Sequence, residues 1–271
     1  MPAQIDLVVN SFERTYRQTI ALGVFPRIEE ENCRAFARRI ALINNVDDPG
    51  DARARAEVLL SRGEIDAYVF VADHLERALQ ICGLTPAELG RIPHYSDCAL
   101  VAVTLEGAPW LLYWDAEVHL EHRYNWVDPA AEFMDEDLGI FAANPASWRG
   151  EVNWSTLDHK GPFALGYGFS DAVFLGRRSE FARPIYRERC LISLRYPLSH
   201  IAADFEQRVD SYMRGHRRLR ATHTGVIYYH PENVGVSYPK PARTERLKRL
   251  RNHLIFRLLG KSHLSHPCLR G

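Results

Sequence analysis

The chain has 271 residues, 46% of them hydrophobic and 25% charged, and its 34 basic residues balance 34 acidic ones. This length allows one large α/β domain or two small ones. The zero formal net charge provides no global field for nucleic acid, and the five scattered cysteines contain no C-x-x-C pair, which favours reduced thiols in a cytosolic protein over disulfides or a zinc site. We find no apolar run long enough to span a bilayer and no signal-peptide pattern at the start.

The first 115 residues alternate short β-rich runs with helical patterns. A helix is expected over 51–61, and another, N-capped by Asp73, toward Cys82-Gly83. Strands alternating with helices imply a mostly parallel sheet covered on both faces. We therefore expect the α/β class with a Rossmann-like central sheet, whose first strands are residues 5–9, 39–45, 67–71 and 111–114.

From Glu121 the texture changes to loops rich in proline, asparagine, aspartate and glycine. These loops hold Trp126, Trp148 and Trp154. Tryptophans in such loops either cap a core or form walls for sugar rings, and the sequence leaves both alternatives open. Further on, residues 200–220 are expected to form one long helix, and residues 226–229 a late strand.

The C-terminal tail, residues 240–261, alternates basic residues with leucines. Leucines recur at helical spacing and basic residues occupy the positions between them: Leu247, Leu250, Leu254 and Leu258, with Arg246, Lys248, Arg249, Arg251 and Arg257. A basic amphipathic helix predicts contact between residues 240–262 and an anionic membrane surface. The alternative is a terminal helix that packs its leucines on the core. RNA binding is less favoured, because no aromatic stacking pattern interleaves the charges.

Two carboxylates follow the apolar stretch 109–114. Asp115 and Glu117 are spaced i, i+2, which on a strand points both side chains to the same side. Adjacent negative charges repel unless a cation or water separates them, and Mg²⁺ or Mn²⁺ bound there could hold a diphosphate in its open positions. In open α/β sheets, ligands lie just beyond the carboxyl ends of the strands. The alternative is a solvated strand end.

The ordered series of strand ends over residues 5–120 resembles the GT-A glycosyltransferases, with a looser match over 126–230. Residues 7–14 are similar to the opening strand and turn of that family, and Asp47-Asp48 to its acidic second-strand end. The resemblance implies six residues that contact the nucleotide or its sugar: Phe12, Glu13, Arg14, Asp47, Asp48 and Asp97. An aromatic face, a carboxylate and an arginine suit a base, a ribose and a phosphate. Asp47 and Asp48 are alternatively a turn before Pro49-Gly50.

By the same resemblance, Asp115 and Glu117 would be the D-x-D motif that binds Mn²⁺ or Mg²⁺ and the donor diphosphate. Glutamate at the third position departs from the commonest form. Asp171 would be the general base of an inverting transfer; the alternative is an N-cap for a helix from Ala172 onward. His230 resembles a further metal ligand of some members, and His223 is the other candidate.

The resemblance thus implies transfer of a sugar from a nucleotide-sugar donor to a hydroxyl acceptor, a glycan or lipid-linked glycan. Residues 1–239 would form the catalytic domain, with a nucleotide-binding half (1–120) and an acceptor-binding half (121–239) that contains the three loop tryptophans. Residues 240–271 would be the basic tail. The expected location is cytoplasmic, with peripheral attachment to the inner face of the cell membrane.

Two other functions remain open. Residues 168–172 are one residue from the G-x-S-x-G elbow of α/β-hydrolases, with Ser170 as nucleophile, Asp204 or Asp210 as acid and His230 as base. The expected sheet lies almost wholly before the serine, whereas that fold needs strands after it. The third possibility is a non-catalytic carbohydrate- or membrane-binding module with the same fold.

Overall fold

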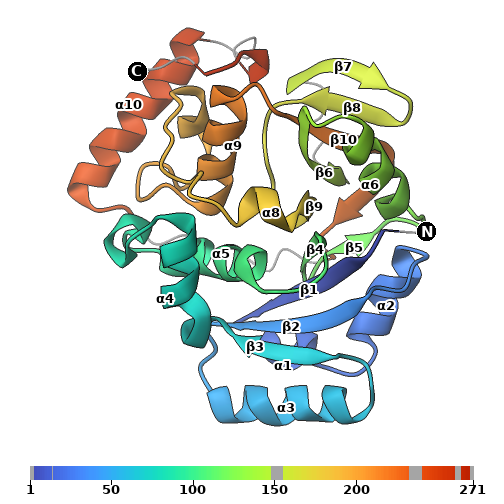
Figure 1. The fold of residues 1–271 in the computed structure, drawn as a ribbon. Helices are drawn as coiled ribbons and strands as arrows, with labels where there is room; N and C mark the ends of the chain where they lie inside the picture. The colour runs from blue at the N-terminus through green and yellow to red at the C-terminus, as the bar shows by residue number, and fades with distance from the viewer. Residues whose placement is uncertain (1–2, 14, 148–154, 232–239, 260–263, 269–271) are drawn as a thin grey trace.

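A computed structural model describes residues 3–13, 15–147, 155–231, 240–259 and 264–268. In its N-terminal half, four parallel strands lie in the spatial order β3-β2-β1-β4 (Figure 1). Helices connect these strands. The elements are β1 (Ile5–Phe12), α1 (Tyr16–Thr19), α2 (Val24–Glu31), β2 (Arg38–Asn44), α3 (Pro49–Ser61), β3 (Ala67–Phe70), α4 (Val71–Cys82), the 3-10 turns η1 (Pro86–Leu89) and η2 (Pro93–Tyr95), α5 (Asp97–Thr104) and β4 (Trp110–Asp115).

The second half extends the same sheet beyond β4 in the order β9-β6-β10-β8-β7, and β5 pairs with β10. Only β6 and β10 run parallel here; the other described pairs are antiparallel. The elements are β5 (His119–Leu120), α6 (Val127–Glu136), β6 (Ile140–Ser147), β7 (Thr156–Lys160), β8 (Phe163–Gly166), β9 (Val173–Arg177), α8 (Arg178–Phe181), the 3-10 turn η3 (Ile192–Arg195), α9 (Phe205–Gly215), β10 (Leu219–Tyr229) and α10 (Arg243–Leu259).

Helices cover both faces of this sheet, as expected. Alternation along β1 sends Leu7 and Val9 to one apolar cluster and Val8 to the other. Helices α1, α2, α3 and α6 complete the first cluster, and α4, α5, α8 and α9 complete the second. The α/β class with a parallel central region is therefore confirmed.

Three local expectations were wrong. Residues 200–220 are not one helix, because the Asp204 side chain caps the start of α9 by accepting from Gln207 N at 2.8 Å, and the chain turns at Arg217 (φ 52) into β10. Residues 173–177 form a strand, so Asp171 does not cap a helix. Asp73 lies in the first turn of α4, whose N-cap is Phe70; an acid there favours the helix dipole instead.

Helix α10 packs on the protein through polar residues and exposes its leucines, the reverse of an ordinary terminal helix. Its buried residues are polar: Glu245 pairs with Arg91 at 2.6 Å, and Asn252 donates to Ser199 Oγ at 3.1 Å. The leucines are exposed, by 66% at Leu247, 56% at Leu250, 48% at Leu254 and 86% at Leu258. The packed-leucine alternative is therefore wrong. No described helix combines the length and hydrophobicity that a membrane span requires.

Candidate functional site

Acidic side chains gather where the carboxyl end of β4 meets the start of β9. Asp115 ends β4 in register with Asn10 of β1, and its backbone N–H donates to Ala172 O at 2.7 Å. Because β9 runs antiparallel to β4, this contact places the loop that contains Asp171 beside the end of β4. The site therefore lies at the edge of the sheet where ligands of open α/β folds bind.

Asp115 and Glu117 interact, although not through strand alternation. Strand β4 ends at Asp115 and Glu117 lies in the turn that follows, so the strand alternation that was expected to align the two side chains does not extend to Glu117. Burial, the charge of Glu117 and the charge of Asp171 together raise the pKa of Asp115 well above its usual range. Glu117 Oε1 is buried and has no hydrogen-bond partner among the described residues. Such an unpaired buried oxygen indicates a missing cation or donor.

Two further acids come from the start of α9. Glu206 Oε1 accepts from the backbone N–H of Asp171 at 3.1 Å, and Asp204 is the N-cap of the helix. Burial and the charge of Asp204 raise the pKa of Asp171 to about 7. Burial, Asp171 and Asp204 raise the pKa of Glu206 well above its usual range, and burial raises that of Asp204 to about 6.

Glu206 was not identified from the sequence. The N-cap pattern at Asp204 could have shown where α9 begins and that Glu206 lies in its first turn. The contact with Asp171 joins residues 35 apart, however, and no local pattern reports it.

No described cation forms an ion pair with any of five acids: Asp115, Glu117, Asp171, Asp204 and Glu206. The charges of Arg208 and Arg195 favour ionised Asp204 and Glu206, but less than burial opposes it. Buried carboxylates without an ion pair are unfavourable and cluster at functional sites. No group of three or more potential ligands with metal-binding geometry occurs among the described residues. Two carboxylates nevertheless suffice for Mg²⁺ or Mn²⁺, which commonly take one or two carboxylates and complete their shell with water and substrate phosphate. The unpaired Glu117 Oε1 fits that role.

The residues expected at the nucleotide divide into two groups. Phe12 and Glu13 lie at the carboxyl end of β1, where Glu13 accepts from Asn45 Nδ2 at 2.7 Å just beyond β2. Asp47 instead pairs with Arg17 at 3.3 Å, and Asp48 caps α3 by accepting from Asp51 N at 3.0 Å. For Asp47 and Asp48 the structure favours the turn alternative.

Asp97 begins α5 and is buried, and its carboxylate accepts from Cys98 N at 2.7 Å. Burial raises its pKa to about 7. Tyr113 of β4 also lies near the start of α5, since its hydroxyl is 3.4 Å from Cys98 Sγ. A role for Asp97 at the donor sugar stays a prediction.

Trp126 is fully buried in the core beside α6, which favours the core-cap alternative over a sugar wall. The other expected residues Arg14, Trp148 and Trp154 lie outside the described residues. His230 follows β10 with its ring 6.5 Å from that of Tyr228. His223 is buried between Tyr124 and Phe163, and burial lowers its pKa.

The hydrolase alternative gains no support from the geometry. Ser170 Oγ lies 3.2 Å from Tyr228 OH, a neutral group, and no described histidine contacts it. Asp210 is held by Arg214 at 3.0 Å and by Ser193 at 2.7 Å, and Asp204 is the cap of α9. Neither acid is free to orient a histidine, so the arrangement lacks the nucleophile–base contact that such catalysis needs.

No family model matches the chain, and no curated protein sequence matches it. Among solved structures, the crystal structure of GalNAc-T7 with UDP, GalNAc and Mn²⁺ matches with a TM-score of 0.52 at 10% identity, over 94% of this chain and 49% of that one. This chain therefore spans about half the length of that structure.

Two further structures match with TM-scores below 0.5. Mouse xyloside xylosyltransferase 1 matches at 0.49 with 11% identity, over 88% of this chain and 100% of that one. Glucosyl-3-phosphoglycerate synthase from Mycobacterium tuberculosis matches at 0.42 with 11% identity, over 96% and 78%. From the strand order, the helices on both faces and the first of these likenesses, we conclude that the chain has the GT-A glycosyltransferase fold.

Proposed function

We propose that this protein transfers a sugar from a nucleotide-sugar donor to a hydroxyl group of an acceptor glycan or lipid-linked glycan. One observation carries the proposal: acids from β4, the loop before β9 and the start of α9 meet, without an ion pair to any described cation, at the carboxyl edge of a GT-A fold. A hard cation and a diphosphate are the ligands that such an edge would accommodate.

In the proposed mechanism, Asp115 and Glu117 bind Mn²⁺ or Mg²⁺, with His230 as a further candidate ligand. The bound ion would neutralise the charge that develops on the leaving diphosphate. Phe12 and Glu13 lie at the end of β1, on the same edge of the sheet, and would contact the nucleotide. Asp97 is assigned to the donor sugar.

Asp171 would deprotonate the acceptor hydroxyl as it attacks the anomeric carbon, with inversion. A general base is most effective when its pKa lies near the working pH, and burial together with Asp204 raises the pKa of Asp171 to about 7. Glu206 would position Asp171, because it accepts from the Asp171 backbone N–H.

The test is a thermal-shift screen of UDP, GDP, CMP and dTDP, each with and without Mn²⁺. A ligand at about 100 times its Kd adds roughly 2.7 kcal/mol of stability. We expect one nucleotide to raise the melting temperature only with metal, and Asp115→Asn to abolish that shift. The matched control is Asp135→Asn, which changes an exposed acid of α6 away from this edge. If no nucleotide shifts the wild type, the proposal fails.

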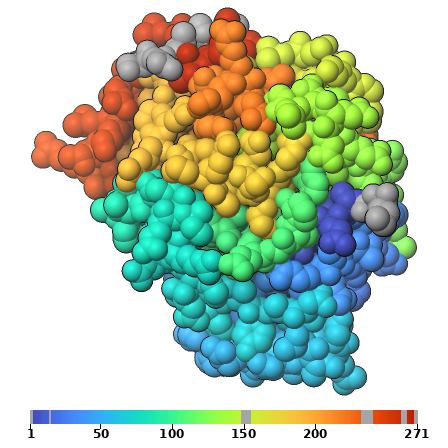
Figure 2. Space-filling view, viewed as in Figure 1, coloured from blue at the N-terminus to red at the C-terminus, as the bar shows by residue number. Residues whose placement is uncertain are grey.

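We also propose that α10 attaches the protein to an anionic membrane surface, which would suit a lipid-linked acceptor. Helix α10 projects at the edge of the molecule (Figure 2). Its four exposed leucines and its exposed lysine and arginines offer an apolar row flanked by positive charge; these basic residues are Arg243, Arg246, Lys248, Arg249, Arg251 and Arg257. Each basic residue near an anionic surface contributes on the order of 1 kcal/mol, and the leucines would enter the interface.

This attachment is tested by sedimentation with vesicles of phosphatidylcholine and phosphatidylglycerol. Leu250→Ser combined with Leu254→Ser should release the protein, as should deletion of residues 240–271. Leu138→Ser is the control, because Leu138 is 67% exposed but lies outside α10. Equal sedimentation of wild type and the double variant would contradict the attachment.

A further inference from the structure

Two arginine side chains from distant parts of the sequence meet at one glycine near the carboxylates. Arg195 ends η3, Arg220 is the second residue of β10, and Gly168 lies in the loop between β8 and β9. A Cβ at Gly168 would lie 2.9 Å from Arg195 Nη2 and 3.6 Å from Arg220 Nη1. Glycine is therefore favoured at position 168 for two reasons: a side chain would crowd the Arg195 guanidinium, and the backbone φ of 108° disfavours any other residue. The two positive charges face one another across it.

Arg220 has no ion-pair partner in the described part of the chain; the charge of Asp210 favours its charged form, but less than burial opposes it. It forms no ion pair or hydrogen bond there, and its Nε is buried without a partner. Burial, with the charge of Arg195 as a further cause, lowers the pKa of Arg220. A buried cation without a counter-ion is strongly unfavourable, so its retention indicates a use.

Other buried or partly buried arginines show how this protein normally satisfies such a group. Arg208 donates to three backbone carbonyl oxygens. Arg34, Arg177 and Arg218 each have a buried nitrogen without a hydrogen-bond partner, but each also pairs with a carboxylate. Arg220 differs from all of these, and its side chain is only partly buried, so that a solute can reach it.

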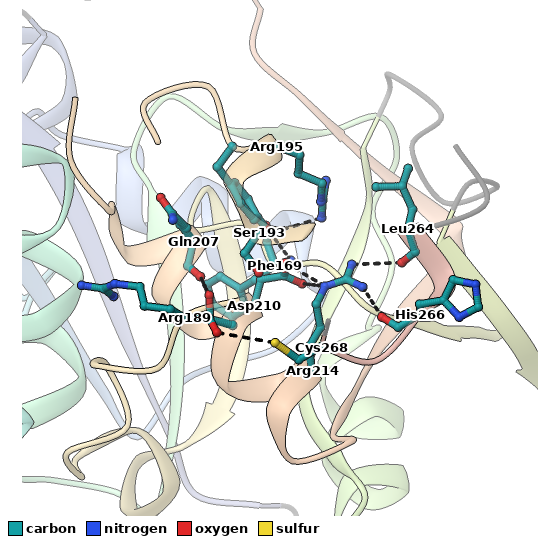
Figure 3. A network of polar contacts seen from close by, with 12 residues as sticks. Phe169, Arg189, Ser193, Arg195, Gln207, Asp210, Arg214, Leu264, His266 and Cys268 are labelled. Atoms are coloured by element: carbon teal, nitrogen blue, oxygen red, sulfur yellow. Dashed lines mark hydrogen bonds and ion pairs between the residues drawn. The ribbon is translucent and has the colours of Figure 1, made fainter. Parts of the chain in front are cut away.

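The surroundings add neutral hydrogen-bonding groups and fix the backbone. Arg195 Nη2 donates to Tyr196 OH at 3.3 Å, and that hydroxyl in turn donates to Phe169 O at 3.0 Å while accepting from Phe169 N at 2.8 Å. Figure 3 shows Arg195 beside Phe169. The loop continues through Ser170, whose hydroxyl lies 3.2 Å from Tyr228 OH, to Asp171. Gly168, where the two arginines meet, therefore lies three positions before the proposed base Asp171.

We propose that Arg195 and Arg220 bind a phosphate group carried by the acceptor. Two guanidinium groups match the charge of a phosphate, which is about −1.5 to −2 for a monoester, and their forked donors match its oxygens. A phosphate held there would bring the attached acceptor toward Asp171. The assignment of the phosphate to the acceptor rests on the proposed glycosyl transfer; the anion site itself does not.

The experiment is titration calorimetry with inorganic phosphate on the full chain. Arg220→Met should weaken phosphate binding at least tenfold, and Arg220→Lys, which keeps the charge but loses the fork, should fall between Arg220→Met and the wild type. Arg62→Met is the matched control, since it removes the same charge from an exposed position at the end of α3. Equal phosphate binding by the wild type and Arg220→Met would overturn the proposal. So would a wild type that binds neither inorganic phosphate nor the lipid phosphate used below.

A melting experiment without phosphate separates loss of the site from loss of the fold. Because Arg220→Met removes a partly buried charge that has no ion-pair partner among the described residues, it should melt at a higher temperature than the wild type. Arg62→Met should melt with the wild type. A lower melting temperature for Arg220→Met would mean that the arginine has a structural partner and would overturn the proposal.

Two further arms identify the source of the phosphate. The first arm uses monomeric short-chain phosphatidic acid. If it binds more tightly than inorganic phosphate, the bound phosphate belongs to a lipid head group; if the two bind equally, it belongs to a soluble phosphate-bearing acceptor. UDP with Mn²⁺ should bind Arg220→Met as it binds the wild type. Loss of nucleotide binding in Arg220→Met would assign the arginines to the donor and overturn the acceptor assignment. Phosphate binding without any nucleotide binding would instead defeat the proposed transfer alone.

Discussion

Helix α9 has two sets of acidic residues, and they differ in whether a cation accompanies them. Asp204 and Glu206 lie at its start without an ion pair to any described residue, beside Asp171. Asp210 lies one turn further along and is fully buried, with Arg214 Nε 3.0 Å from both of its oxygens (Figure 3). Although burial opposes it, Arg214 lowers the pKa of Asp210, whereas the pKa values of Asp204 and Glu206 are raised.

The difference separates a structural carboxylate from candidate functional ones. Asp210 and Arg214 hold several segments together: Ser193 Oγ donates to Asp210 at 2.7 Å, and Arg214 donates to Leu264 O at 2.9 Å and to His266 O. A paired carboxylate of this kind stays ionised and rigid. An acid without a cation has a raised pKa and can exchange a proton near neutral pH, which the proposed base requires.

Replacement of the proposed base should have the largest effect. Asp171→Asn is isosteric and removes proton transfer, so we expect kcat to fall by about 10²–10⁴-fold. Nucleotide binding with Mn²⁺ should persist, and steady-state kinetics combined with the thermal shift would show both. Ser170→Ala, at the neighbouring residue, is the control and should keep most of the activity. Loss of donor binding together with activity in Asp171→Asn would contradict the assignment.

Breaking the structural pair should affect stability instead. Asp210→Asn leaves the buried Arg214 without its counter-charge, which typically destabilises a protein by about 3–5 kcal/mol. Urea unfolding would measure the loss. Asp158→Asn, at an exposed acid of β7, should unfold with the wild type. If Asp210→Asn unfolded like the wild type, the distinction between the two sets of acids on α9 would not hold.

The fold was largely predictable because its N-terminal half is built from local patterns. The strands near residues 5–9, 39–45, 67–71 and 111–114 were placed within a few residues, since apolar runs bounded by turn residues determine them. The second half was harder. The end of α9 depends on the turn at Arg217, and β9 follows a loop rich in glycine and aromatic residues, which gives no clear period.

The site was predictable only in part, and for a physical reason. Asp115 and Asp171 could be singled out because each follows a recognisable local pattern. Whether an acid is compensated depends on residues far away in sequence. Asp47 is paired with a cation, Arg17, 30 residues earlier, whereas Asp171 contacts another acid, Glu206, 35 residues later. Likewise, helical periodicity located the leucines of α10 but could not say that they face outward.

The smallest expected effect is the dependence of stability and activity on pH, which tests whether the acids without an ion pair differ from Asp210. Because the pKa of Asp171 is raised to about 7 from an ordinary 3.8, the folded state holds a proton that the unfolded state releases between these values. Its contribution to stability is therefore present below about pH 4 and is lost as pH rises through 7. Activity should show the opposite trend and rise through about pH 7 as the base becomes ionised.

Asp204→Asn tests the cause of this shift. Asparagine caps a helix about as well as aspartate, so α9 should remain intact. The variant removes the like charge that, after burial, raises the pKa of Asp171, so the midpoint of kcat/KM against pH should move to lower pH. Asp158→Asn, at an exposed acid of β7, is the control and should not move that midpoint. An unchanged midpoint in Asp204→Asn would mean that the charge of Asp204 does not act on Asp171.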